Sequence, residues 1–385
     1  FIPQTIDYQK KNYTVVRISS SSFKNNKSIK WVTFPENSEL ISIEDDAFRS
    51  STLEKILIPS HVQTIGAFAF SSCANLQSFG FAENSELRLI DNSAFSQSSI
   101  ESIVIPSQVR QIKQNAFNNC RSLVTVDFAE NSELRSIENG AFSSTLIEKF
   151  TITSNVDSLK EGCFKNISKL ATIEISPDNK HYAYIDDSLL LYKENEDSDV
   201  YETLIFASPL IKSVSIPSCV REIERYAFEG CKKLKTVQFP DDSNLLYINS
   251  YAFFESSITE IIIPPHVKQI GAYAFNNCKK LKNVKFSENS ELRLIDSYSF
   301  SSTLITSIQI PSNVQQIGSY AFNNCQSLQS LTFSEDSQLI FIDGYSFFGS
   351  SIESVVIPPL VQKIGAYAFS SSQKLQNLSF ASNSQ

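Results

Sequence analysis

The sequence predicts an α/β solenoid: a right-handed stack of short coils with a parallel β-sheet on its concave face and short strands and helical turns on its convex face. Fourteen phenylalanines recur at steps of 25 and 22 residues in alternation, and an apolar-x-x-apolar-x-apolar segment accompanies the steps. A fixed period of about 20 to 50 residues means that each repeat is one unit that buries its apolar face only against its neighbours. The phenylalanines are Phe23, Phe48, Phe70, Phe95, Phe117, Phe142, Phe164, Phe228, Phe253, Phe275, Phe300, Phe322, Phe347 and Phe369.

The apolar segments predict the strands of the concave sheet. Residues 281–286 read Leu-x-x-Val-x-Phe in a 25-residue coil, and residues 100–105 read Ile-x-x-Ile-x-Ile in a 22-residue coil. This is the strand pattern of a leucine-rich repeat, in which alternate side chains point inward and the others face solvent. A proline such as Pro264 or Pro311 follows many of these segments. Because proline lacks an N–H, it ends the pairing of the strand.

The segment after each strand predicts the convex side of a coil. Residues 267–275 read Val-x-x-Ile-Gly-x-x-Ala-Phe. The first part predicts a second short strand, and the second part predicts a helical turn. In this interpretation Ala274 keeps the turn close to the core and Phe275 fills the interior.

The regular spacing of the phenylalanines predicts one solenoid domain over residues 1–385, with one insertion. A single step of 64 residues separates Phe164 from Phe228. The extra residues, at about 176–209, contain two β-prone runs, 182–192 and 200–206, around a polar and acidic turn, which predicts a projecting hairpin. The chain begins with Phe1, lacks methionine and ends in mid-repeat. We therefore expect a fragment truncated at the C-terminus, with any membrane attachment in the missing C-terminal segment.

The composition argues against a polyanionic partner. There are 41 acidic and 33 basic residues, a net charge of −8, and no cluster of lysine and arginine is evident in the sequence. Nucleic acid is therefore not an expected partner. Equivalent cysteines such as Cys73 and Cys120 lie 47 residues apart. At about 4.8 Å per coil, their sulfur atoms would be on the order of 10 Å apart, too far for a disulfide.

No catalytic, metal or cofactor site is predicted, because the side chains that could form one do not converge. His61 and His266 occupy equivalent positions of two coils, and His181 lies beside the insertion without metal-ligand spacing. Acidic pairs such as Glu83 and Glu86 recur in every second coil, on the order of 10 Å apart, too far to share a calcium ion. These pairs are interpreted as a solvated edge or as a track for a basic partner.

One motif carries a resemblance to a known family. Residues 261–278 read Ile-x-Ile-Pro-x-x-Val-x-x-Ile-Gly-x-x-Ala-Phe-x-x-Cys, and variants of this motif recur along nearly the whole chain. The motif resembles the Treponema-type leucine-rich repeats of BspA-like surface proteins. The resemblance implies a cell-surface or secreted, non-catalytic adhesin or surface antigen that binds host or matrix proteins. It implies no cofactor. The alternative is a structural coat protein that self-associates.

Two sets of side chains are candidates for partner binding. The first is a column of tyrosines two residues before each later phenylalanine; duplication of a tyrosine-bearing unit or structural stacking would also explain it. Tyrosine favours recognition because it offers apolar area and a hydroxyl group. The second set consists of apolar residues at solvent-facing strand positions together with Trp31, which could instead pack under residues 1–12. The candidates are Tyr226, Tyr251, Tyr273, Tyr298, Tyr320, Tyr345, Tyr367, Leu57, Val104, Ile262, Val356 and Trp31.

Four sequons could carry glycans if a eukaryote secretes the chain. They are at Asn12, Asn26, Asn166 and Asn377.

Overall fold

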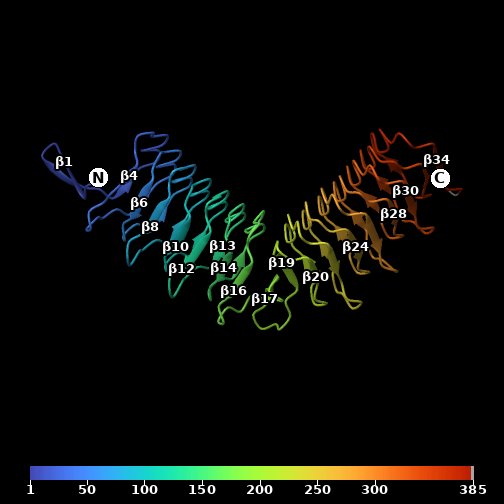
Figure 1. Ribbon diagram of the computed structural model, residues 1–385, viewed down its shortest axis with the longest axis horizontal. Coiled ribbons are helices and arrows are strands. Elements are labelled where there is room, and N and C mark those ends of the chain that lie inside the picture. Colours follow the sequence, from blue (N-terminus) through green and yellow to red (C-terminus); the bar gives the residue numbers. More distant parts are fainter. Residues whose placement is uncertain (383–385) are drawn as a thin grey trace. The chain divides into compact units, whose positions relative to one another are not determined.

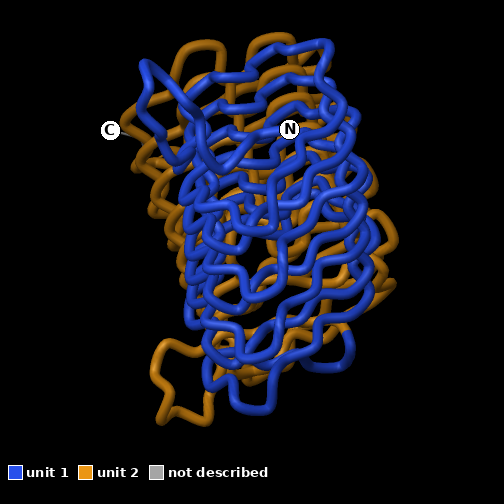
Figure 2. Tube along the Cα trace, turned by 90° about the vertical axis from the view of Figure 1, so that its left-hand side faces the viewer, with its two compact units in different colours: residues 1–187 blue, residues 188–385 orange. Residues whose placement is uncertain are grey.

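The computed structural model describes residues 1–382 and shows stacked coils in two compact units, Phe1–Asp187 and Ser188–Gln385. Figure 1 shows the strands of successive coils side by side within each unit, and Figure 2 colours the two units separately. Each regular coil contributes one strand to a sheet of longer strands and a two-residue strand to a second sheet. The predicted parallel-stranded leucine-rich-repeat solenoid is confirmed in this respect.

Unit 1 begins with a hairpin outside the two sheets, in which β1 (Thr5–Tyr8) pairs antiparallel with β2 (Lys11–Thr14). The strands that we call longer are the two-residue β4 (Trp31–Val32) and the four-residue β6 (Lys55–Ile58), β8 (Ser78–Phe81), β10 (Ser102–Ile105), β12 (Thr125–Phe128), β14 (Lys149–Ile152) and β16 (Thr172–Ile175). They form one sheet of three strands, β4-β6-β8, followed by one of four, β10-β12-β14-β16. The second sheet contains β3 (Arg17–Ile18), β5 (Ser42–Ile43), β7 (Thr64–Ile65), β9 (Leu89–Ile90), β11 (Gln111–Ile112), β13 (Ser136–Ile137) and β15 (Ser158–Leu159), and β17 (Tyr182–Ile185) is the last strand of the unit.

Unit 2 begins with an antiparallel pair, β18 (Leu189–Tyr192) and β19 (Thr203–Ala207), on either side of residues 193–202. Its longer strands are β20 (Ser213–Ser215), β22 (Thr236–Gln238), β24 (Glu260–Ile263), β26 (Asn283–Phe286), β28 (Ser307–Ile310), β30 (Ser330–Phe333), β32 (Ser354–Ile357) and β34 (Asn377–Phe380). The shorter strands, which follow β19 in the second sheet, are β21 (Glu222–Ile223), β23 (Tyr247–Ile248), β25 (Gln269–Ile270), β27 (Leu294–Ile295), β29 (Gln316–Ile317), β31 (Phe341–Ile342) and β33 (Lys363–Ile364).

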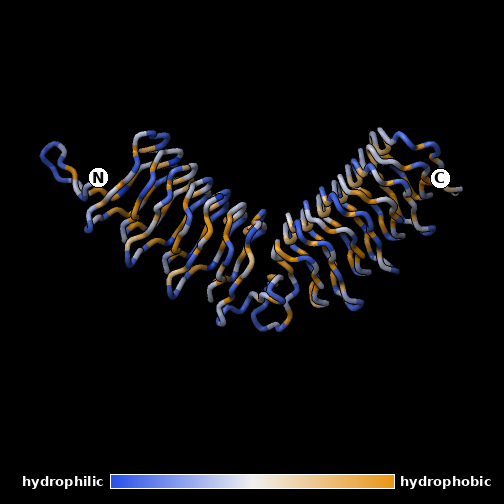
Figure 3. Tube along the Cα trace, in the orientation of Figure 1, coloured by the Kyte–Doolittle hydropathy of each residue, from blue (hydrophilic) through white to orange (hydrophobic). Residues whose placement is uncertain are grey.

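The core of each unit lies between the longer strands and the two-residue strands of the second sheet. In β24, Ile261 and Ile263 are buried, whereas Glu260 and Ile262 face solvent. Figure 3 shows hydrophobic residues at the same place in successive coils. The regularly spaced phenylalanines stack face to face in this interior, with ring centroids 5.0 Å apart for Phe253 and Phe275. The alternation of buried and exposed residues is the one expected of strands covered on one face.

The predicted helical turns of the convex side are wrong, because the structure has no α-helix in residues 1–382. In each of the fourteen phenylalanine coils, the residues two before and two after the phenylalanine have positive φ, as Tyr273 (60°) and Asn277 (57°) do around Phe275. A right-handed helix requires negative φ at every residue, so these positions interrupt it. No described helix is therefore available to cross a membrane.

In these turns, the backbone N–H groups alternate between hydrogen bonds within the coil and hydrogen bonds to the next coil. The N–H groups of Ala274, Asn276 and Cys278 donate to carbonyl groups three residues earlier in the same coil. The alternate N–H groups, of Tyr273, Phe275 and Asn277, donate to the next coil over 2.7 to 3.0 Å. This arrangement satisfies the buried backbone without a helix and joins successive coils on the side away from the longer strands.

The seven cysteines are free. Cys278, buried in the core, illustrates the arrangement of the interior positions: its thiol donates to the Phe253 carbonyl at 3.0 Å and lies 3.3 Å from the Ser256 hydroxyl. Burial raises the pKa of Cys278 to about 12 and that of Cys120 to about 11. These thiols are consequently protonated at neutral pH.

Candidate functional site

The tyrosine column forms one continuous stack along the outer side of unit 2. We call it the tyrosine ladder; it consists of Tyr226, Tyr251, Tyr273, Tyr298, Tyr320, Tyr345 and Tyr367. Neighbouring ring centroids are 4.5 to 5.2 Å apart. The four inner contacts, from Tyr251 to Tyr345, have interplanar angles of 4° or 5°. The structure therefore brings all seven predicted tyrosines together.

Every tyrosine of the ladder has a left-handed backbone, with φ between 57° and 69°. For a residue with a bulky side chain, this conformation costs about 1 to 2 kcal/mol. An aromatic pair contributes about 0.5 to 1.5 kcal/mol beyond the area it buries. Stacking on two sides can therefore offset the backbone cost at an inner tyrosine such as Tyr298.

The rings present their edges and hydroxyl groups outward, because their faces are covered by one another. The inner tyrosines are half-buried, and Tyr367 is 60% exposed. Burial, and then the neighbouring phenols, raise the pKa of Tyr251 and of Tyr298. At the first end of the ladder, the Arg225 guanidinium lies 5.1 Å from the ring centroid of Tyr226. At neutral pH the ladder thus offers apolar ring edges and hydroxyl groups that can donate or accept hydrogen bonds.

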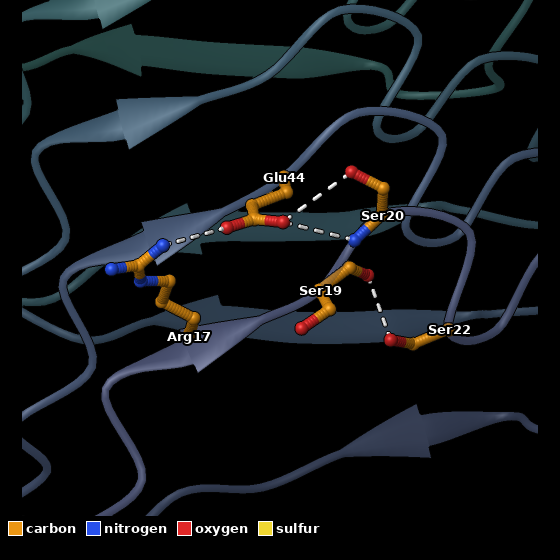
Figure 4. A network of polar contacts seen from close by, with 5 residues as sticks. All are labelled: Arg17, Ser19, Ser20, Ser22 and Glu44. Atoms are coloured by element: carbon orange, nitrogen blue, oxygen red, sulfur yellow. Dashed lines mark hydrogen bonds and ion pairs between the residues drawn. The ribbon is translucent and has the colours of Figure 1, made fainter.

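Unit 1 adopts the same backbone without tyrosine. Its corresponding residues, all with positive φ, are Ser21, Asp46, Phe68, Ser93, Asn115, Gly140 and Gly162. Asp46 accepts hydrogen bonds from Lys24 Nζ at 3.1 Å and Arg49 Nη1 at 3.0 Å. Nearby, the Glu44 carboxylate accepts hydrogen bonds from Arg17 and Ser20 (Figure 4). At Asp46, polar contacts take the place of ring stacking.

The apolar residues on the longer strands do not form one continuous patch. Leu57 on β6 and Val104 on β10 are 56% and 55% exposed, and Leu57 leans over Gly80 of β8, which lies between these strands. Trp31 on β4 is 64% exposed, so residues 1–12 do not bury it. Unit 1 therefore presents a small apolar surface on this face.

In unit 2 the corresponding apolar residues are isolated from one another. Ile262 of β24 lies in a groove of ≈ 860 Å³ whose lining includes the polar residues Gln238, Glu260 and Lys285. Val356 of β32 is separated from it by β26, β28 and β30. A partner on this face would meet single apolar side chains in polar surroundings.

The four sequons lie in different settings. Asn12 on β2, Asn166 and Asn377 on β34 are exposed. Asn26 is half-buried, and its side-chain oxygen Oδ1 accepts hydrogen bonds from the backbone N–H groups of Ser28 and Ile29. Glycosylation at these sites stays a prediction.

The histidines do not gather into a site. His61 Nδ1 and His266 Nδ1 lie 2.9 Å from Glu86 Oε1 and Glu291 Oε1, respectively, in the adjacent coils. Among residues 1–382, no group of three or more His, Cys, Asp or Glu side chains is placed to hold a metal ion.

A concentration of basic side chains that was not predicted from the sequence lies at the edge of unit 2 from which the longer strands begin. We call it the lysine edge; it consists of Lys212, Lys232, Lys233, Lys235, Lys279, Lys280 and Lys282, all exposed. The expectation of no basic cluster is therefore wrong for this edge. The signal in the sequence is the segment Cys-Lys-Lys-Leu-Lys, which occurs at 231–235 and again at 278–282. Because 47 residues separate the two copies, only their stacking reveals the cluster.

Known proteins share both the repeat and the fold. The family model of the BspA type leucine-rich repeat region, in six copies, matches residues 5–97, 88–193, 202–303 and 293–385. A leucine-rich cell surface protein from Faecalibacterium prausnitzii A2-165 is 25% identical, with a TM-score of 0.66 over 99% of this chain and 86% of that one. A leucine-rich repeat protein from Eubacterium ventriosum is 21% identical, with a TM-score of 0.67 over 94% and 89%.

The pneumococcal vaccine antigen PcpA shares the fold at 19% identity, with a TM-score of 0.66 over 100% of this chain and 87% of that one. No sequence among the curated proteins matches. The repeat model nevertheless spans nearly all of the chain, which confirms the resemblance seen in the motif of residues 261–278. The chain belongs to the family of BspA-type leucine-rich repeat proteins.

Proposed function

We propose that this protein is an extracellular, non-catalytic adhesin or surface antigen, which attaches to proteins of host cells or of the extracellular matrix through the tyrosine ladder. The proposal is supported by membership of the BspA-type family and by likeness to a leucine-rich cell surface protein at 25% identity. Solenoids of this kind present long, regular surfaces on which a protein partner can be bound at several points.

The observation that carries the proposal is the presence of tyrosine where the fold does not need it. Glycine and asparagine adopt a left-handed backbone at lower cost than tyrosine, and unit 1 uses Gly140, Gly162 and Asn115 at these positions. The seven tyrosines of unit 2 therefore add a property that folding does not require. Tyrosine is enriched in protein interfaces and in their energetically dominant contacts.

The ladder is suited to a protein partner because its rings are already held in place. The stacked side chains lose little conformational freedom on binding, which reduces the entropic cost of association. Their exposed edges and hydroxyl groups match the mixture of apolar area and hydrogen bonding found in protein interfaces.

The test is binding of the chain to cultured host cells and to immobilised matrix proteins, before and after the triple substitution Tyr273→Asn, Tyr298→Asn and Tyr320→Asn. Asparagine keeps the left-handed backbone accessible, so the coils should still form, which circular dichroism will check. We expect binding to weaken by about tenfold or more, as for the loss of a dominant interface contact.

The matched control is the triple substitution Tyr8→Asn, Tyr13→Asn and Tyr247→Asn, which removes three exposed tyrosines outside the ladder. The control variant should bind as the unchanged chain does. Equal binding by the ladder variant and the unchanged chain would exclude the ladder as the binding surface.

A self-associating coat protein is the alternative function. In unit 2, acidic residues such as Glu288 follow the longer strands, whereas the lysine edge precedes them. A second copy could bring its acidic residues to this edge. Sedimentation at increasing concentration distinguishes the two functions, because a chain that stays monomeric at high concentration cannot form a coat.

A further inference from the structure

The lysine edge spans four consecutive coils, three of which carry lysines while the coil between Lys235 and Lys282 has Thr259 at this position. The Lys235 N–H donates to the Lys212 carbonyl at 2.8 Å, the Thr259 N–H donates to the Lys235 carbonyl at 2.9 Å, and the Lys282 N–H donates to the Thr259 carbonyl at 2.9 Å. Three steps at the strand spacing of about 4.8 Å place Lys212 and Lys282 roughly 14 Å apart along the stack. Lys232 and Lys233, and then Lys279 and Lys280, lie in the turns that lead into β22 and β26.

The charges of this edge are largely unpaired within the chain. Lys232 forms an ion pair with Glu255 at 2.9 Å. The other six lysines have no ion pair among residues 1–382. Lys212 and Lys235 lie on neighbouring coils, and Lys235 and Lys282 are two coils apart, so their exposed charges repel one another weakly and attract an external anion.

The fold does not require lysine at these positions. The residues that correspond to Lys235 and Lys282 in other coils include Glu54 in unit 1 and Glu353 in unit 2, whose N–H groups likewise donate to the preceding coil, at 2.6 and 3.4 Å. An acidic side chain is therefore compatible with the coil. The lysines contribute a surface charge and are not needed for packing.

We propose that the lysine edge binds a linear sulfated polysaccharide laid along the stack of coils. The shape of the cluster favours a narrow polymer that carries negative charge along its length. The edge contains no arginine and no aromatic residue, so it lacks the side chains that stack on nucleic acid bases. A DNA duplex or a flat anionic membrane is wider than the edge and would also approach the rest of a chain with a net charge of −8.

The choice of a polysaccharide also rests on the proposed function, because a protein at the cell surface encounters sulfated polysaccharides on host cells and in the matrix. The contact would add to protein binding at the tyrosine ladder. Because the two surfaces use different residues, each can be removed without the other.

The test measures binding of the full chain to immobilised heparin as a function of sodium chloride concentration. The variant carries Lys233→Gln, Lys235→Gln, Lys280→Gln and Lys282→Gln. We expect the unchanged chain to bind roughly a hundredfold more weakly at 200 mM than at 50 mM salt, as release of counterions from about four contacts predicts. The variant should bind at least about tenfold more weakly than the unchanged chain at 100 mM salt and should lose most of this salt dependence.

A control variant distinguishes the effect of losing the lysine edge from the effect of lowering the net charge of the chain. Lys10→Gln, Lys11→Gln, Lys160→Gln and Lys363→Gln remove four exposed lysines elsewhere, and both variants change the net charge from −8 to −12. The control should keep the binding of the unchanged chain. Equal losses in the two variants, with both folded by circular dichroism, would overturn the proposal.

Other polyanions and a second copy of the chain are further arms of the test. We expect little binding to desulfated heparin, to a short DNA duplex or to vesicles of phosphatidylserine and phosphatidylcholine. Tighter binding to the duplex or to the vesicles than to heparin would overturn the choice of a polysaccharide. Self-association in sedimentation that the four substitutions abolish would assign the edge to a second copy.

The experiments distinguish a failure of the polysaccharide site from a failure of the proposed function. If the variant with the four lysine substitutions loses heparin binding but adheres to matrix proteins as the unchanged chain does, the result supports the polysaccharide site and shows that adhesion does not use the lysine edge. Failure of the chain to bind heparin, with adhesion that still depends on the tyrosines, would overturn only the polysaccharide site.

Discussion

Neighbouring tyrosines of the ladder should stabilise one another, and a double-mutant cycle can measure this. Tyr298 and Tyr320 stack with ring centroids 4.5 Å apart and an interplanar angle of 5°. We consider Tyr298→Asn, Tyr320→Asn and the double variant. Each substitution relieves part of the backbone cost of about 1 to 2 kcal/mol, because asparagine adopts the left-handed conformation more readily than tyrosine, and it removes the contacts of one ring. The single variants therefore combine opposing effects of similar size and should change stability by only about 0 to 2 kcal/mol.

The double-mutant cycle measures the contact between the two rings alone. The change in backbone cost at one position is the same whether the other position is tyrosine or asparagine, so it cancels. We expect a coupling energy of about 0.5 to 1.5 kcal/mol, the range measured for aromatic pairs. The assay is equilibrium unfolding in urea, with an unchanged slope across the four chains as the condition for comparison. Tyr273 and Tyr320 are two steps apart in the ladder, and their cycle serves as the control. A coupling below about 0.3 kcal/mol for the adjacent pair, or equal couplings for both pairs, would refute the reasoning.

Two further predictions concern ionisable groups. In the native chain at pH 8, a thiol reagent such as DTNB should modify Cys219, which is half-exposed, before the six buried cysteines, and all seven should react in denaturant; rapid modification of more than one thiol in the native state would contradict this. Burial raises the pKa of Asp46, but hydrogen bonds from Arg49 and Lys24 outweigh it, so the net shift is downward from 3.8. Because the pKa is lower in the native state than in the unfolded state, the ionised carboxylate stabilises the native state at pH values above the unfolded pKa. This stabilisation is lost as the pH falls through the folded pKa. Asp46→Asn should therefore reduce stability at pH 7 by less than about 1 kcal/mol, because the pair is partly exposed. The difference from the unchanged chain should shrink towards pH 2, and a constant difference in urea midpoint between pH 7 and pH 2 would exclude this origin.

The strands could be predicted from sequence because their signal is local and repeated. The alternation in residues 260–263 places Ile261 and Ile263 inside and leaves Ile262 exposed, as in β24. A strand covered on one face requires this alternation, so burial and sequence pattern coincide.

The turns could not be predicted correctly because the pattern Ala-Phe-x-x-Cys fits both a helical turn and the observed structure. Tyrosine rarely adopts a left-handed backbone, so a tyrosine such as Tyr273 gives no indication in the sequence that its φ is positive. Gly140 and Gly162 in unit 1 offered a signal, because glycine and asparagine at a repeated position indicate positive φ. The alignment of unlike residues in equivalent coils would have revealed it.

The lysine edge escaped prediction for a different reason. Lys233 and Lys280 lie far apart in sequence, and a net charge of −8 conceals a local excess of positive charge. Charge clusters in a solenoid depend on residues one or two periods apart. Counting charges along a column of coils, instead of along the chain, is needed to find them.

The backbone hydrogen bonds between coils have a consequence for how such a surface can change during evolution. At the position before each longer strand, Glu54, Val124, Lys235 and Thr259 all form the same N–H to carbonyl link to the preceding coil. The spacing of the array is therefore independent of the outward side chain. Single substitutions can alter the charge or chemistry of one coil without altering the structure of its neighbours. A binding surface for a new ligand can therefore arise by successive substitutions at equivalent positions of the coils, while the backbone stays unchanged.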